Sequence, residues 1–132
     1  MDSRPTRTGG SWLTRRARSF IYAGRGVWLL VVTEPNARIH LVATVLVVGF
    51  SLWLQLSPGE WCAIISAMAL VWVAEGANSA LEALADHVAP ERHPLIGRAK
   101  DVAAGAVLIA SIAAAVIGLI TLGPKLWLRL HS

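Results

Sequence analysis

The 132-residue sequence contains little charge and almost no cysteine. Charged residues make up 15% of the chain and hydrophobic residues 55%, whereas soluble domains average about 25% charged residues. A soluble domain of this size has too small an interior to bury so much apolar surface. The shortage of charge therefore predicts a membrane protein. Because Cys62 is the single cysteine, a disulfide framework and a cysteine-based metal site are excluded.

Two patterns typical of other protein classes are also missing. No Gly-x-x-x-x-Gly-Lys-Ser/Thr loop occurs, so any nucleotide has to be bound without a Walker-type phosphate cradle. The net charge is +4, but seven of the twelve Lys and Arg residues precede or open the first long apolar run. Such a flank indicates a cytoplasmic N-terminus beside anionic headgroups. No basic groove with stacking aromatic residues follows, so no nucleic-acid partner is predicted.

Apolar runs and helix breakers predict an all-α membrane protein with an N-terminal amphipathic surface helix and three transmembrane helices. Residues 1–10 are predicted to be disordered and residues 11–132 to form a single domain. Arginines are interspersed with large apolar residues over about 11–33, which favours a helix on the membrane surface. Spans are expected at about 37–56, 61–86 and 98–122, near the roughly 20 residues that a bilayer core requires. Gly123-Pro124 is expected to end the third span.

The loops between the spans predict the orientation. Residues 57–60 form a tight turn without Lys or Arg, whereas Arg92, Arg98 and Lys100 surround the second loop. The N-terminus and the second loop are therefore expected on the cytoplasmic side, and the C-terminus outside. Lys125 and Arg129 argue mildly against an outside C-terminus, but the N-terminal excess of positive charge is larger.

Five polar residues share one face of the second predicted span, within an arc of about 100°. These residues form a polar stripe of Glu75, Asn78, Ser79, Glu82 and Asp86. Glu75 lies about 21 Å along the helix from Trp61, inside a core about 30 Å thick, whereas Glu82 reaches the interface. A carboxylate in the core is costly and marks a functional site. We predict that Glu75 is a general base and that Glu82 and Asp86 are placed to hold a hard cation.

Other charged residues are expected at the same membrane level. Glu34 lies at the joint before the first span, and Lys100 and Asp101 open the third span. Together with the stripe they supply five carboxylates, an amide and an ammonium, which suits a magnesium-bound polyphosphate beside a lipid substrate. The alternative is that the stripe is only the water-exposed end of a long helix. That reading is favoured for Asp86, Glu91 or Arg92 taken singly, but Glu75 is too deep for it.

The sequence resembles the prokaryotic diacylglycerol kinases and the related undecaprenol kinases over about residues 15–124. The family pattern Glu-x-x-Asn-Ser/Thr-Ala-x-Glu-x-x-x-Asp matches residues 75–86. A Glu-x-His loop follows at residues 91–93, and an Ala-Lys-Asp start to the third span at 99–101. The resemblance implies a lipid kinase of the bacterial inner membrane that uses ATP and Mg²⁺. It also implies a homotrimer with sites shared between subunits.

The resemblance further implies a role for each matched residue. Glu75 corresponds to the general base, and Glu34 and Glu82 to metal ligands that also contact the nucleotide. Asn78 and Asp86 correspond to supporting residues, and Arg38 to a substrate contact. The remaining nucleotide contacts are Arg15, Tyr22, Glu91, Arg92, His93, Lys100 and Asp101.

The substrate remains open between undecaprenol and diacylglycerol. Residues 38–40 (Arg-Ile-His) and 101–109 look closer to undecaprenol kinases, whereas diacylglycerol kinases more often carry a carboxylate where His40 stands. Undecaprenol is therefore favoured, although the apolar faces of the spans suit both kinds of tail. Two other classes are a small transporter with a carboxylate cation site and a non-enzymatic assembly factor. The transporter does not need Lys100 and Asp101 facing the stripe, and the assembly factor does not need Glu75.

Overall fold

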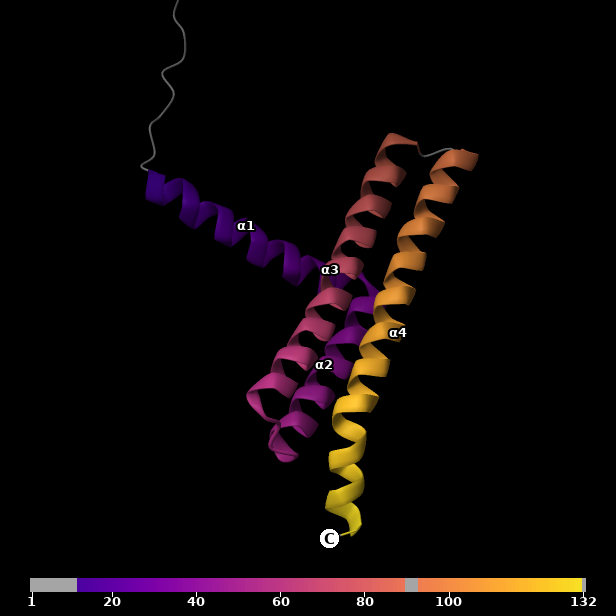
Figure 1. The fold of residues 1–132 in the computed structure, drawn as a ribbon. Helices are drawn as coiled ribbons and strands as arrows, with labels where there is room; N and C mark the ends of the chain where they lie inside the picture. The colour runs from indigo at the N-terminus through magenta and orange to yellow at the C-terminus, as the bar shows by residue number, and fades with distance from the viewer. Residues whose placement is uncertain (1–11, 90–92, 132) are drawn as a thin grey trace, which may run out of the picture.

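The computed structural model describes residues 12–89 and 93–131, and every regular element in these ranges is a helix (Figure 1). The helices are α1 (Trp12–Thr33), α2 (Pro35–Trp53), α3 (Pro58–Val88) and α4 (Pro94–His131). This confirms the predicted all-α class. Within the described residues, α2, α3 and α4 are long and apolar enough to cross a membrane. The predicted disorder of residues 1–10 lies outside the described residues.

Prolines set where three of the four helices begin. Pro35, Pro58 and Pro94 each open a helix, where the missing N–H costs nothing and the fixed φ suits the first turn. Glu34, before Pro35, is extended with φ −97° and ψ 118°, because a residue that precedes proline is disfavoured in the helical region. The chain therefore turns at Glu34 between α1 and α2.

The helices pack as an antiparallel pair with α2 along one half of it. α3 and α4 lie side by side, α2 lies against the half of α3 nearest their connecting turn, and α1 leads away from the other three (Figure 1). Trp72 Nε1 on α3 donates to Thr44 Oγ1 on α2 over 3.0 Å. α1 approaches α3 near its own end, where a Cβ added to Gly76 would lie 3.8 Å from Leu30 Cδ2.

The third span differs from its prediction at both ends. α4 does not stop at Gly123-Pro124 but continues through Pro124 to His131, and it begins at Pro94 rather than near Arg98. A proline removes only one backbone hydrogen bond, and apolar surroundings penalise any further unwinding, which would expose more unpaired groups. The 38 residues of α4 span about 57 Å, so the helix extends well beyond a bilayer core of about 30 Å.

Candidate active site

Glu75 and Asn78 are the buried polar residues in the second half of α3. Glu75 is 1% exposed and Asn78 7% exposed, three residues apart and therefore on one helix face, as predicted. Glu75 Oε2 and Asn78 Oδ1 have no hydrogen-bond partner among the described residues. Buried polar atoms in folded proteins nearly always have partners. These two oxygens are therefore free to accept hydrogen bonds from a bound group.

Glu82 lies one turn further along the same face and is held by Asn78. Asn78 Nδ2 donates to Glu82 Oε1 over 3.0 Å, a contact between residues i and i+4 of a helix. Glu82 is half-buried, and its second carboxylate oxygen makes no hydrogen bond to the described residues. The amide thus orients one carboxylate oxygen and leaves the other for a ligand.

Glu34 brings a third carboxylate to this region from the α1–α2 joint. It is half-buried, and Thr33 Oγ1 donates to its Oε1 over 3.3 Å. Glu34, Glu82 and His40 all interact electrostatically with Glu75. Leu30 of α1 lies near α3 at this level, since a Cβ added to Gly76 would be 3.8 Å from Leu30 Cδ2, an ordinary contact distance. Glu34 and Glu82 therefore lie within electrostatic range of Glu75.

Lys100 connects α4 to the outer end of the stripe. Its Nζ lies 2.8 Å from Asp86 Oδ1, and its charge also interacts with Glu82. The Asp86 side chain is 70% exposed and that of Lys100 34%. Asp101 is exposed on the next position of α4. An ammonium beside the carboxylates is suited to bind the phosphates of a nucleotide.

Some predicted nucleotide contacts are not brought to the carboxylates within the described part of this chain. Arg15 and Tyr22 are exposed in the first half of α1, the part that leads away from α3 and α4 (Figure 1). Glu91 and Arg92 lie outside the described residues. The structure therefore leaves the roles of these four residues as predictions.

Arg38 and His93 have structural contacts of their own. Arg38 Nε donates to Val31 O over 3.1 Å and Arg38 Nη2 to Val32 O, which closes the last turn of α1. His93 Nδ1 accepts a hydrogen bond of 3.3 Å from the backbone N–H of Leu95 at the start of α4. Both residues still carry further polar atoms, so these contacts do not conflict with the roles that the resemblance implies.

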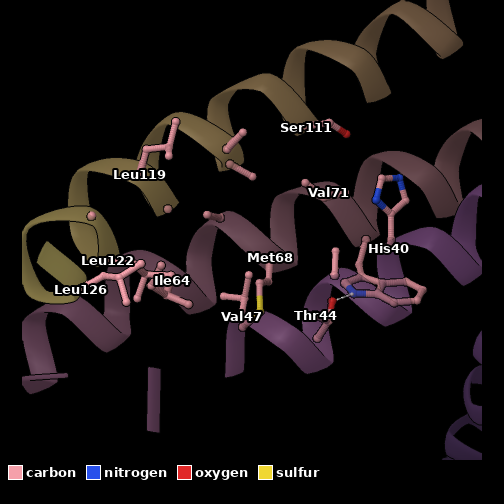
Figure 2. A pocket seen from close by; sticks show the side chains of 17 residues that line it. His40, Thr44, Val47, Ile64, Met68, Val71, Ser111, Leu119, Leu122 and Leu126 are labelled. Atoms are coloured by element: carbon pink, nitrogen blue, oxygen red, sulfur yellow. Dashed lines mark hydrogen bonds between the residues drawn. The ribbon is translucent and has the colours of Figure 1, made fainter. Parts of the chain in front are cut away.

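An apolar groove of about 600 Å³ between α2, α3 and α4 runs from His40 to Leu126 (Figure 2). Most of its lining is aliphatic, and its polar groups are those of His40, Thr44, Trp72 and Ser111. His40 also interacts with Glu75, so one end of the groove adjoins the carboxylates. His40 is not among the site residues predicted from the sequence. Its place in an apolar span was the signal for a site residue, because ionisable residues there are rare and costly.

The residues present fit a divalent cation that is shared with a substrate. Within residues 12–89 and 93–131, no three His, Cys, Asp or Glu side chains are grouped so as to hold a metal ion by themselves. Mg²⁺ is usually bound by one or two carboxylates together with phosphate oxygens of the substrate. Glu34 and Glu82 provide two carboxylates that interact electrostatically with Glu75, whose Oε2 has no partner among the described residues.

Known proteins similar to this chain are lipid kinases. A profile of the prokaryotic diacylglycerol kinases matches residues 21–122. The chain is 38% identical to the undecaprenol kinase of Bacillus subtilis (strain 168) over 128 residues, which cover 96% of this chain and 100% of that protein. It is 37% identical to the diacylglycerol kinase of Escherichia coli (strain K12) over 103 residues, or 78% and 84% of the two chains. A diacylglycerol kinase of Synechocystis sp. is 39% identical over 109 residues, 82% of this chain and 62% of the relative.

Proposed function

The chain belongs to the prokaryotic diacylglycerol kinase family and is an ATP-dependent membrane lipid kinase; from this premise we propose that Glu75 activates the hydroxyl of undecaprenol for phosphorylation. The observation that carries this proposal is the buried carboxylate of Glu75, which has one unpartnered oxygen. An apolar groove adjoins it through His40. The base thus lies at one end of an apolar groove, where the hydroxyl of a lipid alcohol can meet the γ-phosphate of a nucleotide.

Glu75 accepts the proton of the lipid hydroxyl while the hydroxyl oxygen attacks the γ-phosphorus of ATP. The bond from this phosphorus to the β–γ bridging oxygen breaks, ADP leaves, and the proton on Glu75 is released to water. The protein contributes mainly position and charge in such transfers, because the transition state is loose. Asn78 supports the reaction by orienting Glu82 through its 3.0 Å hydrogen bond.

The carboxylates and Lys100 hold the nucleotide. Glu34 and Glu82 would hold Mg²⁺ together with the phosphates of ATP, and such a cation would offset phosphate charge there. Lys100 contacts the phosphates, and Asp86 keeps its ammonium at this level through the 2.8 Å ion pair. Asp101, His93, Glu91 and Arg92 bind other parts of the nucleotide, and Arg38 contacts the lipid substrate.

A neighbouring subunit completes the site. Arg15 and Tyr22 are assigned to the nucleotide but lie on the part of α1 that leads away from the carboxylates (Figure 1). We assign them to the site of an adjacent chain in a homotrimer. Mixing Arg15→Ala subunits with Glu75→Gln subunits should then restore part of the activity, because some mixed sites receive both intact residues. Mixtures as inactive as the separate variants would contradict shared sites.

The lipid tail lies along the α2–α3–α4 groove, with the enzyme in the bacterial inner membrane and its N-terminus in the cytoplasm. The wall that α4 contributes includes Ala114, Ala115 and Gly118, whose small side chains leave room for a branched isoprenoid chain. The arginines of α1 favour the cytoplasmic side of the membrane. Residues 11–132 act as one catalytic domain in this arrangement.

A competition assay tests the choice of lipid. The purified protein in micelles receives magnesium ATP with undecaprenol and diacylglycerol at equal surface fraction. We expect undecaprenyl phosphate as the main product. A strong preference for diacylglycerol would overturn the choice of substrate and leave the lipid-kinase activity intact, whereas failure of Glu75→Gln to reduce turnover would overturn the role of Glu75.

A further inference from the structure

The last two turns of α4 carry a pair of cations beyond the part of the chain that the family profile matches. The profile ends at residue 122, and the helix continues to His131. Lys125 and Arg129 are four residues apart and therefore on one face of α4. Both reach back to the α2–α3 turn, where Lys125 meets Glu60 and Arg129 meets Trp53. These contacts lie at the opposite end of the α3–α4 pair from Lys100 and Asp86.

Lys125 is held in place by a carboxylate that already has other partners. Its Nζ lies 3.0 Å from Glu60 Oε2. The same oxygen accepts hydrogen bonds from the backbone N–H and the hydroxyl of Ser57, over 2.6 and 2.7 Å. An ammonium has three donors, and this ion pair is the polar contact found for Lys125 among the described residues. Lys125 is therefore positioned and still able to donate to an anion.

Arg129 carries a charge that no acceptor in the described residues neutralises. Its guanidinium carbon lies 5.9 Å from the centroid of the Trp53 ring, and it has no hydrogen bond or ion pair there. The indole face attracts the cation and fixes its position. All five N–H donors of this exposed guanidinium remain available, which suits a bidentate phosphate contact.

The two cations border a hollow of about 310 Å³. Its lining consists of Trp53, Leu54, Gln55, Lys125, Leu128 and Arg129. Among the described residues, the charges of Lys125, Arg129 and Glu60 sum to about +1 at neutral pH. The hollow lies between the end of α2 and the last turns of α4, and a tryptophan at a span end is typical of the headgroup level of a bilayer.

We propose that this hollow binds the phosphate headgroup of an anionic phospholipid, on the membrane face opposite the kinase site. The guanidinium of Arg129 and the ammonium of Lys125 donate to the phosphate oxygens. The acyl chains continue along the apolar helices past Leu54 and Leu128, which a free phosphate cannot do. Basic pockets at the ends of transmembrane helices bind lipid headgroups by this chemistry.

Amide hydrogen exchange of residues 125–131, measured in nanodiscs, tests the proposal. The full-length protein is placed in phosphatidylcholine discs with and without phosphatidylglycerol. At a lipid concentration about ten times the dissociation constant, exchange through local opening of residues 125–131 should slow about tenfold. The double variant Lys125→Gln/Arg129→Gln should lose this protection. Its kinase activity should stay near the wild-type level, since the site for chemistry is at the other end.

Matched controls separate a site from general charge attraction. The double variant Arg16→Gln/Arg18→Gln removes the same amount of charge from α1. It is a matched control because Arg16 also stacks on a tryptophan, with its guanidinium carbon 5.3 Å from the centroid of the Trp12 ring. This variant should keep the protection of residues 125–131. If Lys125→Gln/Arg129→Gln is inactive, Arg129→Gln alone decides, because it breaks no ion pair. Protection that survives these substitutions, no effect of phosphatidylglycerol on the wild type, or equal protection by inorganic phosphate in phosphatidylcholine discs would overturn the proposal.

Discussion

Two regions of the α3–α4 pair carry carboxylates, and among the described residues these regions differ in whether a buried carboxylate oxygen is left without a partner. At the turn end, Glu60 accepts two hydrogen bonds from Ser57 and pairs with Lys125. In the half of α3 that leads to the other end, Glu75 is 1% exposed and its Oε2 has no partner among the described residues. The first arrangement fixes a helix start and joins α3 to α4. The arrangement at Glu75 leaves a buried carboxylate oxygen without a hydrogen-bond partner, which is typical of a site that binds a substrate.

The largest effect is expected from Glu75→Gln, which tests whether the unsatisfied end performs the chemistry. The amide keeps the size of the side chain but cannot take up the proton of the lipid hydroxyl. Turnover should fall by about 10²–10⁴-fold, the usual contribution of a general base. Nucleotide titration should give nearly the wild-type affinity. Phosphorylation assays that show near-wild-type turnover would remove Glu75 from this role.

A smaller effect is expected from Glu82→Gln, which separates nucleotide binding from proton transfer within the same end. The change removes one metal-binding charge and alters the partner of Asn78 Nδ2. Affinity for magnesium ATP should fall about 10–100-fold, as for the loss of one hydrogen bond to a charged group. Isothermal titration with and without Mg²⁺ measures this. Equal weakening of metal-free nucleotide binding would contradict the role of Glu82 as a metal ligand.

Glu60→Gln should affect stability rather than activity. It weakens the capping box at Ser57 and removes the charge that pairs with Lys125. The midpoint of thermal unfolding in micelles should therefore fall by several degrees while kinase turnover is kept, since helix caps and ion pairs stabilise the folded state. A large loss of turnover at temperatures where the variant is folded would show that the two ends are coupled.

The smallest effect is expected from Gly76→Ala, at the contact between α1 and α3 next to Glu75. The added Cβ would lie 3.8 Å from Leu30 Cδ2, an ordinary contact distance. Because alanine favours helix over glycine by about 0.5–1 kcal/mol, the free energy of unfolding should stay the same or rise slightly. Denaturation in mixed micelles measures the change. A clear loss of stability would mean that α1 packs more tightly on α3 than this distance indicates.

Much of the fold was predictable because apolar runs and prolines divide the chain. The 20-residue apolar stretches identified the three spans, and Pro35, Pro58 and Pro94 mark where helices begin. The end of α4 was mispredicted because Pro124 was treated as a helix breaker, a rule that holds best in water. Because no helix was expected beyond Pro124, the contacts of Lys125 and Arg129 were not predicted either. Their engagement with Glu60 and Trp53 gives these cations a structural role and weakens them as a signal of orientation.

The candidate site was predictable where it depends on one helix and not where it depends on packing. Helical periodicity alone placed Glu75, Asn78 and Glu82 on one face, and the structure adds the hydrogen bond between the last two. The ion pair of Lys100 with Asp86 joins residues fourteen positions apart on different helices. The positions of Lys100 and Asp86 in the sequence predict that both lie at the same membrane level, but they do not predict that the two side chains form an ion pair. The groove beside His40 is formed by three helices, so it could not be predicted without knowing how these helices pack.

The most direct test compares Glu75→Gln and Glu60→Gln in the same micelle preparation, measuring both turnover and the midpoint of thermal unfolding for each. Glu75→Gln should lose turnover and keep or raise the unfolding midpoint, because a buried carboxylate without a partner is replaced by a neutral amide. Glu60→Gln should keep turnover and unfold at a lower temperature. If the two variants lose activity and stability in parallel, the division between a structural end and a catalytic end is contradicted.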